Sequence, residues 1–210
     1  MMRDLVIVTG ASQGIGKAIK EKLTPVYEVV GISRRGDYEF DLTELDQIPR
    51  AFADICLNKD LKILINCAGY VEPKGILEMS TEEVETTLKI NLASTIVCTQ
   101  QFVKYNKSGG KLINIASTAG QRPSPGWSAY AAAKAGVINF SLTMAEELRD
   151  YGIRVYCIAP GRCATELRRK LAPEEDQSKI MQPSEVADLV EMLVEDRNLL
   201  ANQVITIKKG

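Results

Sequence analysis

The chain carries Thr9-Gly10-Ala11-Ser12-Gln13-Gly14-Ile15-Gly16 directly after a short apolar run, Leu5-Val6-Ile7-Val8, and directly before a helical pattern. A glycine-rich turn between a strand and a helix brings backbone amides and the helix N-terminus against a phosphate group. Gly10 lets the chain turn, Gly14 permits a close approach, and Gly16 lets the helix pack on the strand. The spacing is GxxxGxG rather than GxGxxG, so taken alone the stretch also fits an ordinary tight turn.

Similar apolar runs recur along the chain and alternate with helical patterns. Strands buried on both faces are predicted at residues 5–8, 29–32, 62–65, 111–115 and 155–158. Helices are predicted at residues 14–23, 80–103 and 128–151, and the second begins with Ser80 or Thr81 as N-cap. The alternation predicts an α/β fold, a mostly parallel sheet with helices on both faces, in a single domain of residues 1–210.

One connection is unusually short. After the second predicted strand, Ser33-Arg34-Arg35-Gly36-Asp37 leads within a few residues to Tyr38-Glu39-Phe40-Asp41-Leu42. Parallel neighbours are usually joined by a helix, and this interval has no room for one. We expect a loop in its place.

Composition excludes several classes of function. The 210 residues are 45% hydrophobic and 25% charged, with a net charge of -1, which argues against disorder and against a nucleic-acid partner. The amino terminus lacks the apolar core and cleavage site of a signal peptide, and no apolar run approaches the roughly 20 residues that span a bilayer. We therefore expect a cytoplasmic protein with no membrane partner.

Histidine is absent, and the five cysteines at positions 56, 67, 98, 157 and 163 show no CxxC spacing. These two facts exclude the common zinc sites and the Ser-His and Cys-His hydrolases, so no metal is expected. The cysteines are expected to be small buried hydrophobic residues in a reducing compartment. Another role is left open only for Cys163, which follows Arg162 in a predicted loop.

The segment Tyr130-Ala131-Ala132-Ala133-Lys134 has high helix propensity, so its tyrosine and lysine share one face. An ammonium group beside a phenol favours its ionisation, which predicts a pKa lowered from about 10 toward working pH. Such a phenol can give a proton to an alkoxide or take one from an alcohol. The spacing alone also fits an ordinary pair on the surface of a helix.

The TGASQGIG stretch closely resembles the cofactor loop of the short-chain dehydrogenase/reductase family, and the family's other motifs follow in order along the chain. Asp41-Leu42 is similar to its adenine contact, Asn66-Cys67-Ala68-Gly69 to its turn after the fourth strand, and Pro160-Gly161 to its turn after the sixth. The resemblance implies a Rossmann-like, doubly wound sheet and an oxidoreductase that uses a nicotinamide cofactor.

The same resemblance implies a role for individual cofactor-binding residues. Asp41 would meet the adenine amino group, Asn66 and Ala68 would support the central strand and the ribose, and Thr165 would reach the carboxamide side of the nicotinamide. Without the resemblance, a turn cap is the better reading of Asp41. The implied set comprises Gly10, Ser12, Gln13, Gly14, Ile15, Gly16, Ser33, Arg34, Arg35, Asp41, Leu42, Asn66, Ala68, Gly69, Tyr130, Lys134, Pro160, Gly161 and Thr165.

Four further positions resemble the family's catalytic tetrad: Asn91, Ser117, Tyr130 and Lys134. Ser117 stands 13 residues before Tyr130, which is the family's spacing. By resemblance, Ser117 hydrogen-bonds the substrate carbonyl, Tyr130 is the acid or base, and Lys134 binds the nicotinamide ribose and tunes the tyrosine. Asn91 would hold, through its helix backbone, a water that links Lys134 to solvent.

The end of the second strand indicates which cofactor is preferred. A ribose 2′-hydroxyl calls for an acid there, whereas a 2′-phosphate calls for a guanidinium group. Ser33, Arg34 and Arg35 therefore predict NADP(H), although a solvated basic turn also fits them. The glycine loop carries Gln13 where many NADP-dependent members have a second basic residue, and this departure weakens the preference.

The predicted function is the interconversion of a small carbonyl compound and its alcohol, with reduction as the physiological direction. A cofactor-sensing regulator of the same fold, a module of a larger assembly, and an epimerase or dehydratase are the alternatives. Family members form dimers or tetramers through their long helices, so a homodimer or homotetramer is expected. The small residues at 92–97 and 131–133 suit such contacts, but they also suit the protein's own core.

A final expectation concerns the segment after Pro160-Gly161. We call the segment between Gly161 and Pro183 the flap, because it would close over the substrate. It is expected to be short, since a new capped helix begins at Pro183-Ser184-Glu185-Val186. Cations gather around this flap, and they suggest a small polar or anionic substrate: Arg122, Arg162, Arg168, Arg169 and Lys170. Solvated charges on a mobile loop are the alternative.

Overall fold

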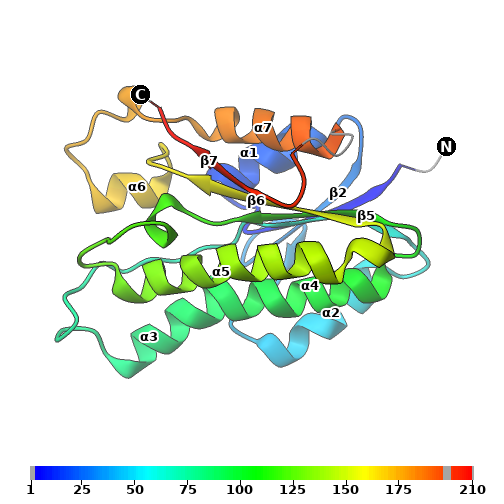
Figure 1. The fold of residues 1–210 in the computed structure, drawn as a ribbon, viewed down its shortest axis with the longest axis horizontal. Coiled ribbons are helices and arrows are strands. Elements are labelled where there is room, and N and C mark those ends of the chain that lie inside the picture. Colours follow the sequence, from blue (N-terminus) through cyan, green and yellow to red (C-terminus); the bar gives the residue numbers. More distant parts are fainter. Residues whose placement is uncertain (1–2, 196–199, 210) are drawn as a thin grey trace.

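The strands of the computed structural model, which describes residues 3–195 and 200–209, form one parallel sheet (Figure 1). The order across the sheet is β3-β2-β1-β4-β5-β6-β7. This arrangement confirms the predicted Rossmann-like α/β class. The strands are β1 (Leu5–Thr9), β2 (Glu28–Ser33), β3 (Tyr38–Glu39), β4 (Leu61–Asn66), β5 (Gly110–Ile115), β6 (Ile153–Pro160) and β7 (Val204–Ile207).

Helices cover both faces of the sheet (Figure 1). One face carries α1 (Gly14–Leu23) and α7 (Pro183–Glu195), and the other carries α2 (Ile48–Ile55), α4 (Ser94–Tyr105) and α5 (Ser128–Glu147). The remaining helices are α3 (Thr81–Leu88), which leads into α4, and the short α6 (Glu166–Leu171) beyond β6. Single turns are η1 (Leu45–Gln47), η2 (Lys89–Ala93), η3 (Thr118–Gly120), η4 (Arg149–Tyr151) and η5 (Gln177–Lys179).

Each face of the sheet buries its own core. Phe52 of α2 and Phe102 of α4 pack with Leu64 on one face, and all three are fully buried. On the other face Ile19 of α1 packs with Tyr156, also fully buried. Because a parallel strand contributes side chains to both cores, its sequence is a continuous apolar run rather than an alternating one. This explains why the central strands could be located from the sequence.

The local predictions are largely confirmed. Ser80 is the N-cap of α3: its hydroxyl accepts from the amide of Glu83 at 3.2 Å, and the Glu83 carboxylate accepts from the amide of Ser80 at 2.9 Å. The short interval after β2 is a loop, which ends in a two-residue strand paired through Ile32 and Tyr38. The sequence analysis missed α2 and β7. It also treated residues 80–103 as one helix, whereas η2, a π-helical turn, separates α3 from α4.

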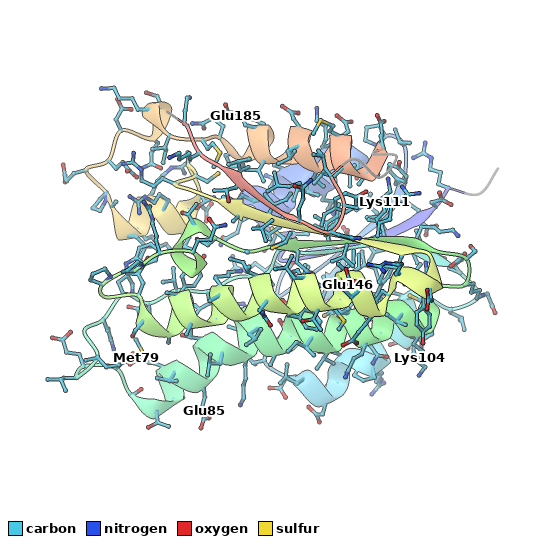
Figure 2. All side chains as sticks on the ribbon, viewed as in Figure 1. Met79, Glu85, Lys104, Lys111, Glu146 and Glu185 are labelled. Atoms are coloured by element: carbon cyan, nitrogen blue, oxygen red, sulfur yellow. The ribbon has the colours of Figure 1, made fainter. Side chains whose placement is uncertain are left out.

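Lys111, near the start of β5, ties the sheet to α7 (Figure 2). Its ammonium group donates to the backbone oxygen of Leu193 at 3.1 Å and also to that of Val194. The last carbonyl groups of a helix have no partner within the helix and carry the negative end of its dipole. A cation from the sheet therefore caps the carboxyl end of α7.

The burial of β4 can be tested by removing one side chain. Leu64→Ala is expected to lower the free energy of unfolding by about 2–5 kcal/mol, because Leu64 is fully buried and the vacated space cannot close completely. Leu77→Ala is the control, since Leu77 is 97% exposed, and its effect should stay within about 0.5 kcal/mol. Urea denaturation of both variants gives the comparison. Equal losses would show that β4 is not the buried strand described here.

Candidate active site

A cleft of about 790 Å³ opens at the carboxyl ends of the central strands. In Figure 1 this is the end of the sheet at which α6 lies. Its walls come from the loops that follow β1, β2, β4, β5 and β6, together with α6 and the start of α5. In doubly wound sheets the ligand site lies at this edge, where connections on the two sides of the sheet diverge. The position of the cleft is therefore set by the strand order.

The glycine loop lies against the loop after β4. Gly10 has a φ of 69°, and a Cβ on it would stand 2.7 Å from the Cα of Ala68. The hydroxyl of Thr9, which the sequence analysis did not single out, accepts from the amides of Cys67 at 3.0 Å and Ala68 at 3.2 Å. Gly14 also has a positive φ and lies against Thr165. Because Gly10 and Gly14 have no side chains, the backbone of the glycine loop lines the cleft at these two positions.

The residues of the basic turn after β2 differ in whether they line the cleft. Ser33 and Arg34 line the cleft, whereas Arg35 does not. The hydroxyl of Ser33 donates to the backbone oxygen of Arg35, which holds the turn closed. Asp37 lies outside the cleft lining, where its carboxylate accepts from Lys20 and from the amide of Gly31 at 2.9 Å.

Asp41 and Asn66 are held by interactions within the chain. One carboxylate oxygen of Asp41 accepts from the amide and the hydroxyl of Thr43, both at 2.9 Å, as a turn cap would, and Asp41 also lines the cleft. Asn66 is buried and does not line the cleft. Its amide donates to Asn114 at 2.9 Å and to Thr99 at 3.3 Å, so it joins β4 to β5 and α4.

Three polar groups meet on the wall formed by β5 and α5. Tyr130 and Lys134 lie in the first two turns of α5, and the Tyr130 hydroxyl is hydrogen-bonded to Ser117. The ammonium group of Lys134 lies 5.8 Å from the centre of the Tyr130 ring and donates to the backbone oxygen of Ile115 at 2.9 Å. Trp127 lies edge-on to the Tyr130 ring, with centroids 5.8 Å apart. The grouping can hold a carbonyl oxygen and exchange a proton with it.

The predicted pKa of the tyrosine is wrong in direction. Burial is the largest influence, and it raises the pKa of Tyr130 above its usual value, while the hydrogen bond with Ser117 acts the other way. Burial also lowers the pKa of Lys134 to about 8. The charged form of either group is costly away from water. Burial therefore outweighs the expected effect of a neighbouring ammonium group on the phenol.

Asn91 lies one layer behind these groups, in the π-helical turn η2. Its side-chain amide donates to the backbone oxygens of Tyr70 at 2.6 Å and Thr87 at 2.9 Å, and its oxygen accepts from the amide of Tyr70 at 3.2 Å. Asn91 is fully buried and does not line the cleft. It joins the helix to the loop that follows β4.

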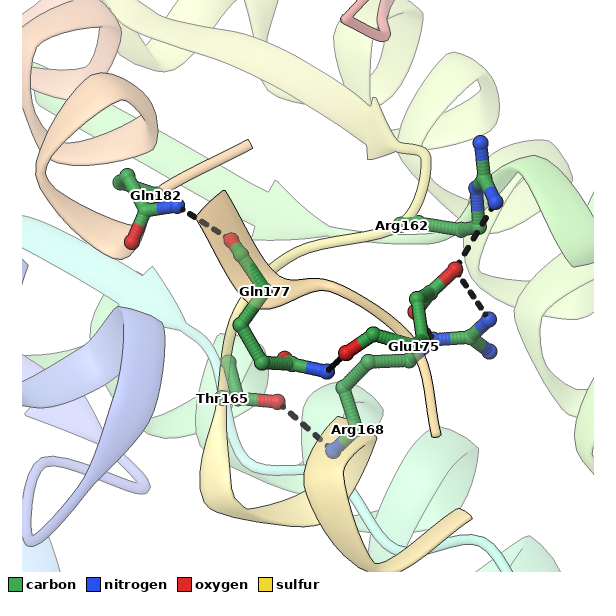
Figure 3. A network of polar contacts seen from close by, with 6 residues as sticks. All are labelled: Arg162, Thr165, Arg168, Glu175, Gln177 and Gln182. Carbon is green, nitrogen blue, oxygen red and sulfur yellow. Dashed lines mark hydrogen bonds and ion pairs between the residues drawn. The ribbon is translucent and has the colours of Figure 1, made fainter. Parts of the chain in front are cut away.

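The short flap is fastened by one carboxylate, as Figure 3 shows. Glu175 accepts from Arg162 at 2.8 Å and, through both of its oxygens, from Arg168 at 2.5 and 3.0 Å. The hydroxyl of Thr165 accepts from the amide of Arg168 and so caps α6. The side-chain amide of Gln177 donates to the backbone oxygen of Glu175 at 2.9 Å. The flap is as short as expected.

The prediction of a cluster of free cations around this flap needs correction. Arg162 and Arg168 line the cleft, but both are paired with Glu175. The pKa of Glu175 is lowered, chiefly by its hydrogen bond with Arg168, so the carboxylate stays charged. Arg169 and Lys170 are exposed and do not line the cleft. Of the five cations predicted around the flap, Arg122 alone lines the cleft without an ion pair to a carboxylate of the described residues.

The predicted burial of the cysteines is confirmed for four of the five, whereas Cys67 is half-buried and lines the cleft. All five are free thiols, and four of them are buried: Cys56, Cys98, Cys157 and Cys163. Burial raises the pKa of Cys163 to about 11, so nothing marks it as a nucleophile. Among the residues that the structure describes, no cluster of His, Cys, Asp or Glu could hold a metal ion. Over the same residues, no helix has the length and apolar character needed to cross a membrane.

Comparison with known proteins identifies the family. The family model described as short chain dehydrogenase matches residues 4–176. The chain belongs to the short-chain dehydrogenase family. It is accordingly an oxidoreductase that acts on CH–OH or carbonyl groups with a nicotinamide cofactor.

Individual short-chain dehydrogenases are similar over almost the whole chain. A 3-oxoacyl-[acyl-carrier-protein] reductase of Synechocystis sp. is 31% identical over 222 residues, which cover 91% of this chain and 89% of the relative. Among solved structures, 4-hydroxyisoleucine dehydrogenase complexed with NADH is 26% identical with a TM-score of 0.86, covering 99% of this chain and 97% of that one. ElxO with NADP bound is 26% identical with a TM-score of 0.88, covering 98% and 97%.

Most residues predicted from the resemblance to short-chain dehydrogenases lie on the cleft wall. The exceptions are Asn66 and Asn91, which are buried, and Arg35, which is exposed. Thr9 was not among the predicted site residues, although it stands in the glycine stretch that opens the first helix. Nor was Trp127, which is the chain's single tryptophan and stands three residues before Tyr130. Its position beside the predicted acid could have marked it as part of the site.

The burial of Lys134 in this short-chain dehydrogenase predicts a dependence of stability on pH. Its pKa of about 8 in the folded chain lies below the 10.5 of an exposed lysine, so between these values the unfolded chain binds more protons. The free energy of unfolding should therefore rise with pH from 8 to 10 relative to that of Lys134→Met, by up to about 1.4 kcal/mol per pH unit. Urea denaturation at several pH values measures this difference. A constant difference would contradict the burial.

Proposed function

We propose that the chain is an NADP(H)-dependent reductase of ketones or aldehydes, and that Tyr130 exchanges the proton that accompanies hydride transfer. The proposal is carried by one observation: Ser117, Tyr130 and Lys134 meet on a single wall of the cleft, which the loops that follow β1 and β6 also line. Two hydroxyl groups that meet at one point suit a carbonyl oxygen. The cleft volume of about 790 Å³ has room for a dinucleotide beside a small substrate.

The residues of the cleft fit a dinucleotide. The glycine loop keeps side chains away from the cleft where the chain turns at Gly10 and Gly14, so backbone amides can approach a pyrophosphate. Next to this loop, where Gly14 lies against Thr165, the residues Pro160, Gly161 and Thr165 line the space where a nicotinamide ring would lie. The cofactor, when bound, supplies the hydride, and the protein contributes proximity and electrostatics.

Each polar group has a distinct task in the proposed reaction. Ser117 donates a hydrogen bond to the substrate oxygen and stabilises the negative charge that grows there. Tyr130 delivers the proton to that oxygen. A phenol with a raised pKa is fully protonated at neutral pH, and reduction requires this form.

Lys134 and Asn91 act through their positions. Lys134 is anchored on the backbone oxygen of Ile115, which leaves its other protons for the ribose hydroxyls of the nicotinamide and for Tyr130. Asn91 fixes the π-helical turn and the Tyr70 backbone next to this ammonium group. We propose that this turn holds the water that links Lys134 to solvent.

Removal of the phenol hydroxyl tests the assignment of Tyr130. Tyr130→Phe is expected to lower kcat by about 10²–10⁴-fold, the usual contribution of a positioned acid. NADPH binding, followed by its fluorescence, should remain close to that of the parent protein. Tyr151→Phe is the matched control, because Tyr151 is 62% exposed and remote from the cleft lining. Near-full turnover by Tyr130→Phe, measured over a panel of carbonyl compounds, would disprove the assignment.

The preference for NADP(H) is supported by the turn after β2. Arg34 lines the cleft together with Ser33, and the acid of this loop, Asp37, is held outside by Lys20 and the Gly31 amide. A guanidinium group can form charge-assisted hydrogen bonds with a 2′-phosphate, while a nearby carboxylate would repel it. Similar solved structures hold NADP in one case and NADH in another. The turn of this chain favours NADP(H).

Cofactor preference can be reversed by exchanging the charges of that turn. The parent protein should show a higher kcat/KM with NADPH than with NADH, and Ser33→Asp combined with Arg34→Ala should invert the order. Arg35→Ala is the control, because Arg35 does not line the cleft, and it should preserve the preference. The measurement is steady-state kinetics with both cofactors at a fixed substrate concentration. Equal efficiency of the parent protein with NADPH and NADH would contradict the proposal.

A cytoplasmic location and a homodimer or homotetramer are part of the same proposal. The small residues suggested for subunit contact are divided between two environments. Ser94, Thr95 and Ala133 are buried within the chain, whereas Ala132 on α5 is exposed. Any contact between copies would therefore use the exposed positions of α5, such as Ala132 and Leu142.

A further inference from the structure

A second cavity, of about 410 Å³, adjoins the cleft and is strongly basic. Five of its ten lining residues are cationic and none is acidic. The cationic residues are Arg122, Arg162, Lys179, Lys208 and Lys209, and the others are Thr118, Gln121, Gly161, Ile180 and Thr206. We call it the basic cavity.

Its cations come from separate parts of the sequence and meet because of the strand order. Arg122 follows β5, Arg162 follows β6, and Lys208 follows β7, and these three strands are neighbours in the parallel sheet. The carboxyl ends of parallel strands lie at one edge, so the residues after them converge. Lys179, from the turn η5, closes the remaining side.

The positive charge of the basic cavity is only partly compensated. Glu175 pairs with Arg162 but is shared with Arg168, and Asp176 lies 3.6 Å from Lys179. No carboxylate in the described part of the chain forms an ion pair with Arg122, Lys208 or Lys209. Lys209 has one weak contact, 3.4 Å to the backbone oxygen of Ser178. Cations of like sign in one cavity repel each other and attract an anion.

The basic cavity adjoins the cleft of the proposed reaction and shares part of its lining. Thr118, Arg122, Gly161 and Arg162 line both spaces. Thr118 directly follows Ser117, the residue that would hold the substrate oxygen. A molecule whose carbonyl group lies at Ser117 can therefore extend past Thr118 into the basic cavity.

We propose that the basic cavity binds a phosphate group carried by the carbonyl substrate, at a position remote from the carbonyl. The inference rests on the proposed reductase function and specifies its substrate class. A phosphate brings up to two negative charges and several acceptor oxygens, which suit an arginine fork together with lysines. The side chains of Gln121 and Thr206, which are hydrogen-bonded to each other at 2.9 Å, add neutral donors at the wall.

The anion site thus lies beside the helix α6 rather than on it. Arg168 is engaged by Glu175, and Arg169 and Lys170 lie outside both cavities. The uncompensated charge instead lies at Arg122 and at the Lys208-Lys209 pair. The basic cavity gives this pair a specific role in recognition.

Binding is tested first with inorganic phosphate, by calorimetry at low ionic strength in the presence of saturating NADP⁺, which fills the phosphate sites of the cleft. Lys208→Gln combined with Lys209→Gln should weaken phosphate binding by about tenfold, and added salt should weaken it in the parent protein. Arg169→Gln combined with Lys170→Gln removes the same charge from the nearby flap and should preserve binding. Equal weakening in both double variants, or no phosphate binding to the parent protein, would overturn the proposal.

Kinetics then identify the source of the phosphate. With matched ketones that differ only in a terminal phosphate, the ratio of kcat/KM for the phosphorylated to the unphosphorylated compound should fall about tenfold in the Lys208/Lys209 variant. It should persist in the Arg169/Lys170 variant. Phosphate binding that depends on Lys208 and Lys209 with an unchanged ratio would indicate a free anion, and would overturn the assignment to the substrate.

A third variant separates this proposal from the proposed function. Tyr130→Phe should bind inorganic phosphate as the parent protein does, because Tyr130 does not line the basic cavity. If Tyr130→Phe kept its turnover while Lys208→Gln with Lys209→Gln lost phosphate, only the assigned proton donor would be wrong. If the phosphate measurement failed while Tyr130→Phe was inactive, the reductase function would stand without the phosphate site.

Discussion

The arrangement of the site depends on the close contact between the loops that follow β1 and β4. A Cβ on Gly10 would stand 2.7 Å from Ala68, and the Thr9 hydroxyl binds two amides of the loop after β4. The connections that leave β1 and β4 go to opposite halves of the sheet, so a crevice opens between them. The contact holds together the two loops that border this crevice, and residues of both loops line the cleft.

A second close packing positions the groups that handle the proton. A Cβ on Gly120 would stand 2.6 Å from the backbone of Lys134, so the turn η3 lies directly on α5. Ser117, the N-cap of η3, is thereby held against the first turns of α5, which carry Tyr130. The side chain of Lys134 is itself buried, and this burial lowers its pKa to about 8.

The sequence predicted the parts of the fold and site that depend on local spacing. Continuous apolar runs located the central strands, and motif spacing located the glycine loop, Ser117, Tyr130 and Lys134. The burial of a side chain cannot be read from the spacing of residues. The i, i+4 spacing predicted that Lys134 lies beside Tyr130, but it could not predict that desolvation has the largest effect on the pKa of both groups. The helix α2 was missed because it is short and has Pro49 in its first turn. Pairings between separate segments, such as Glu175 with Arg162, were also invisible.

The ion pairs of Glu175 with Arg162 and Arg168 decide which cations near the cleft can attract a ligand. By composition the flap is basic, yet Glu175 engages two of its arginines, and its side chain is only 15% exposed. A bidentate arginine–carboxylate pair in such a place is strong and geometrically fixed. Arg162 and Arg168 therefore stabilise the flap through Glu175. The cations without a carboxylate partner are the residues that follow β5 and β7, namely Arg122, Lys208 and Lys209. A count of charges along the sequence therefore misplaces the anion-attracting surface, and the strand order β5-β6-β7 brings it beside Ser117.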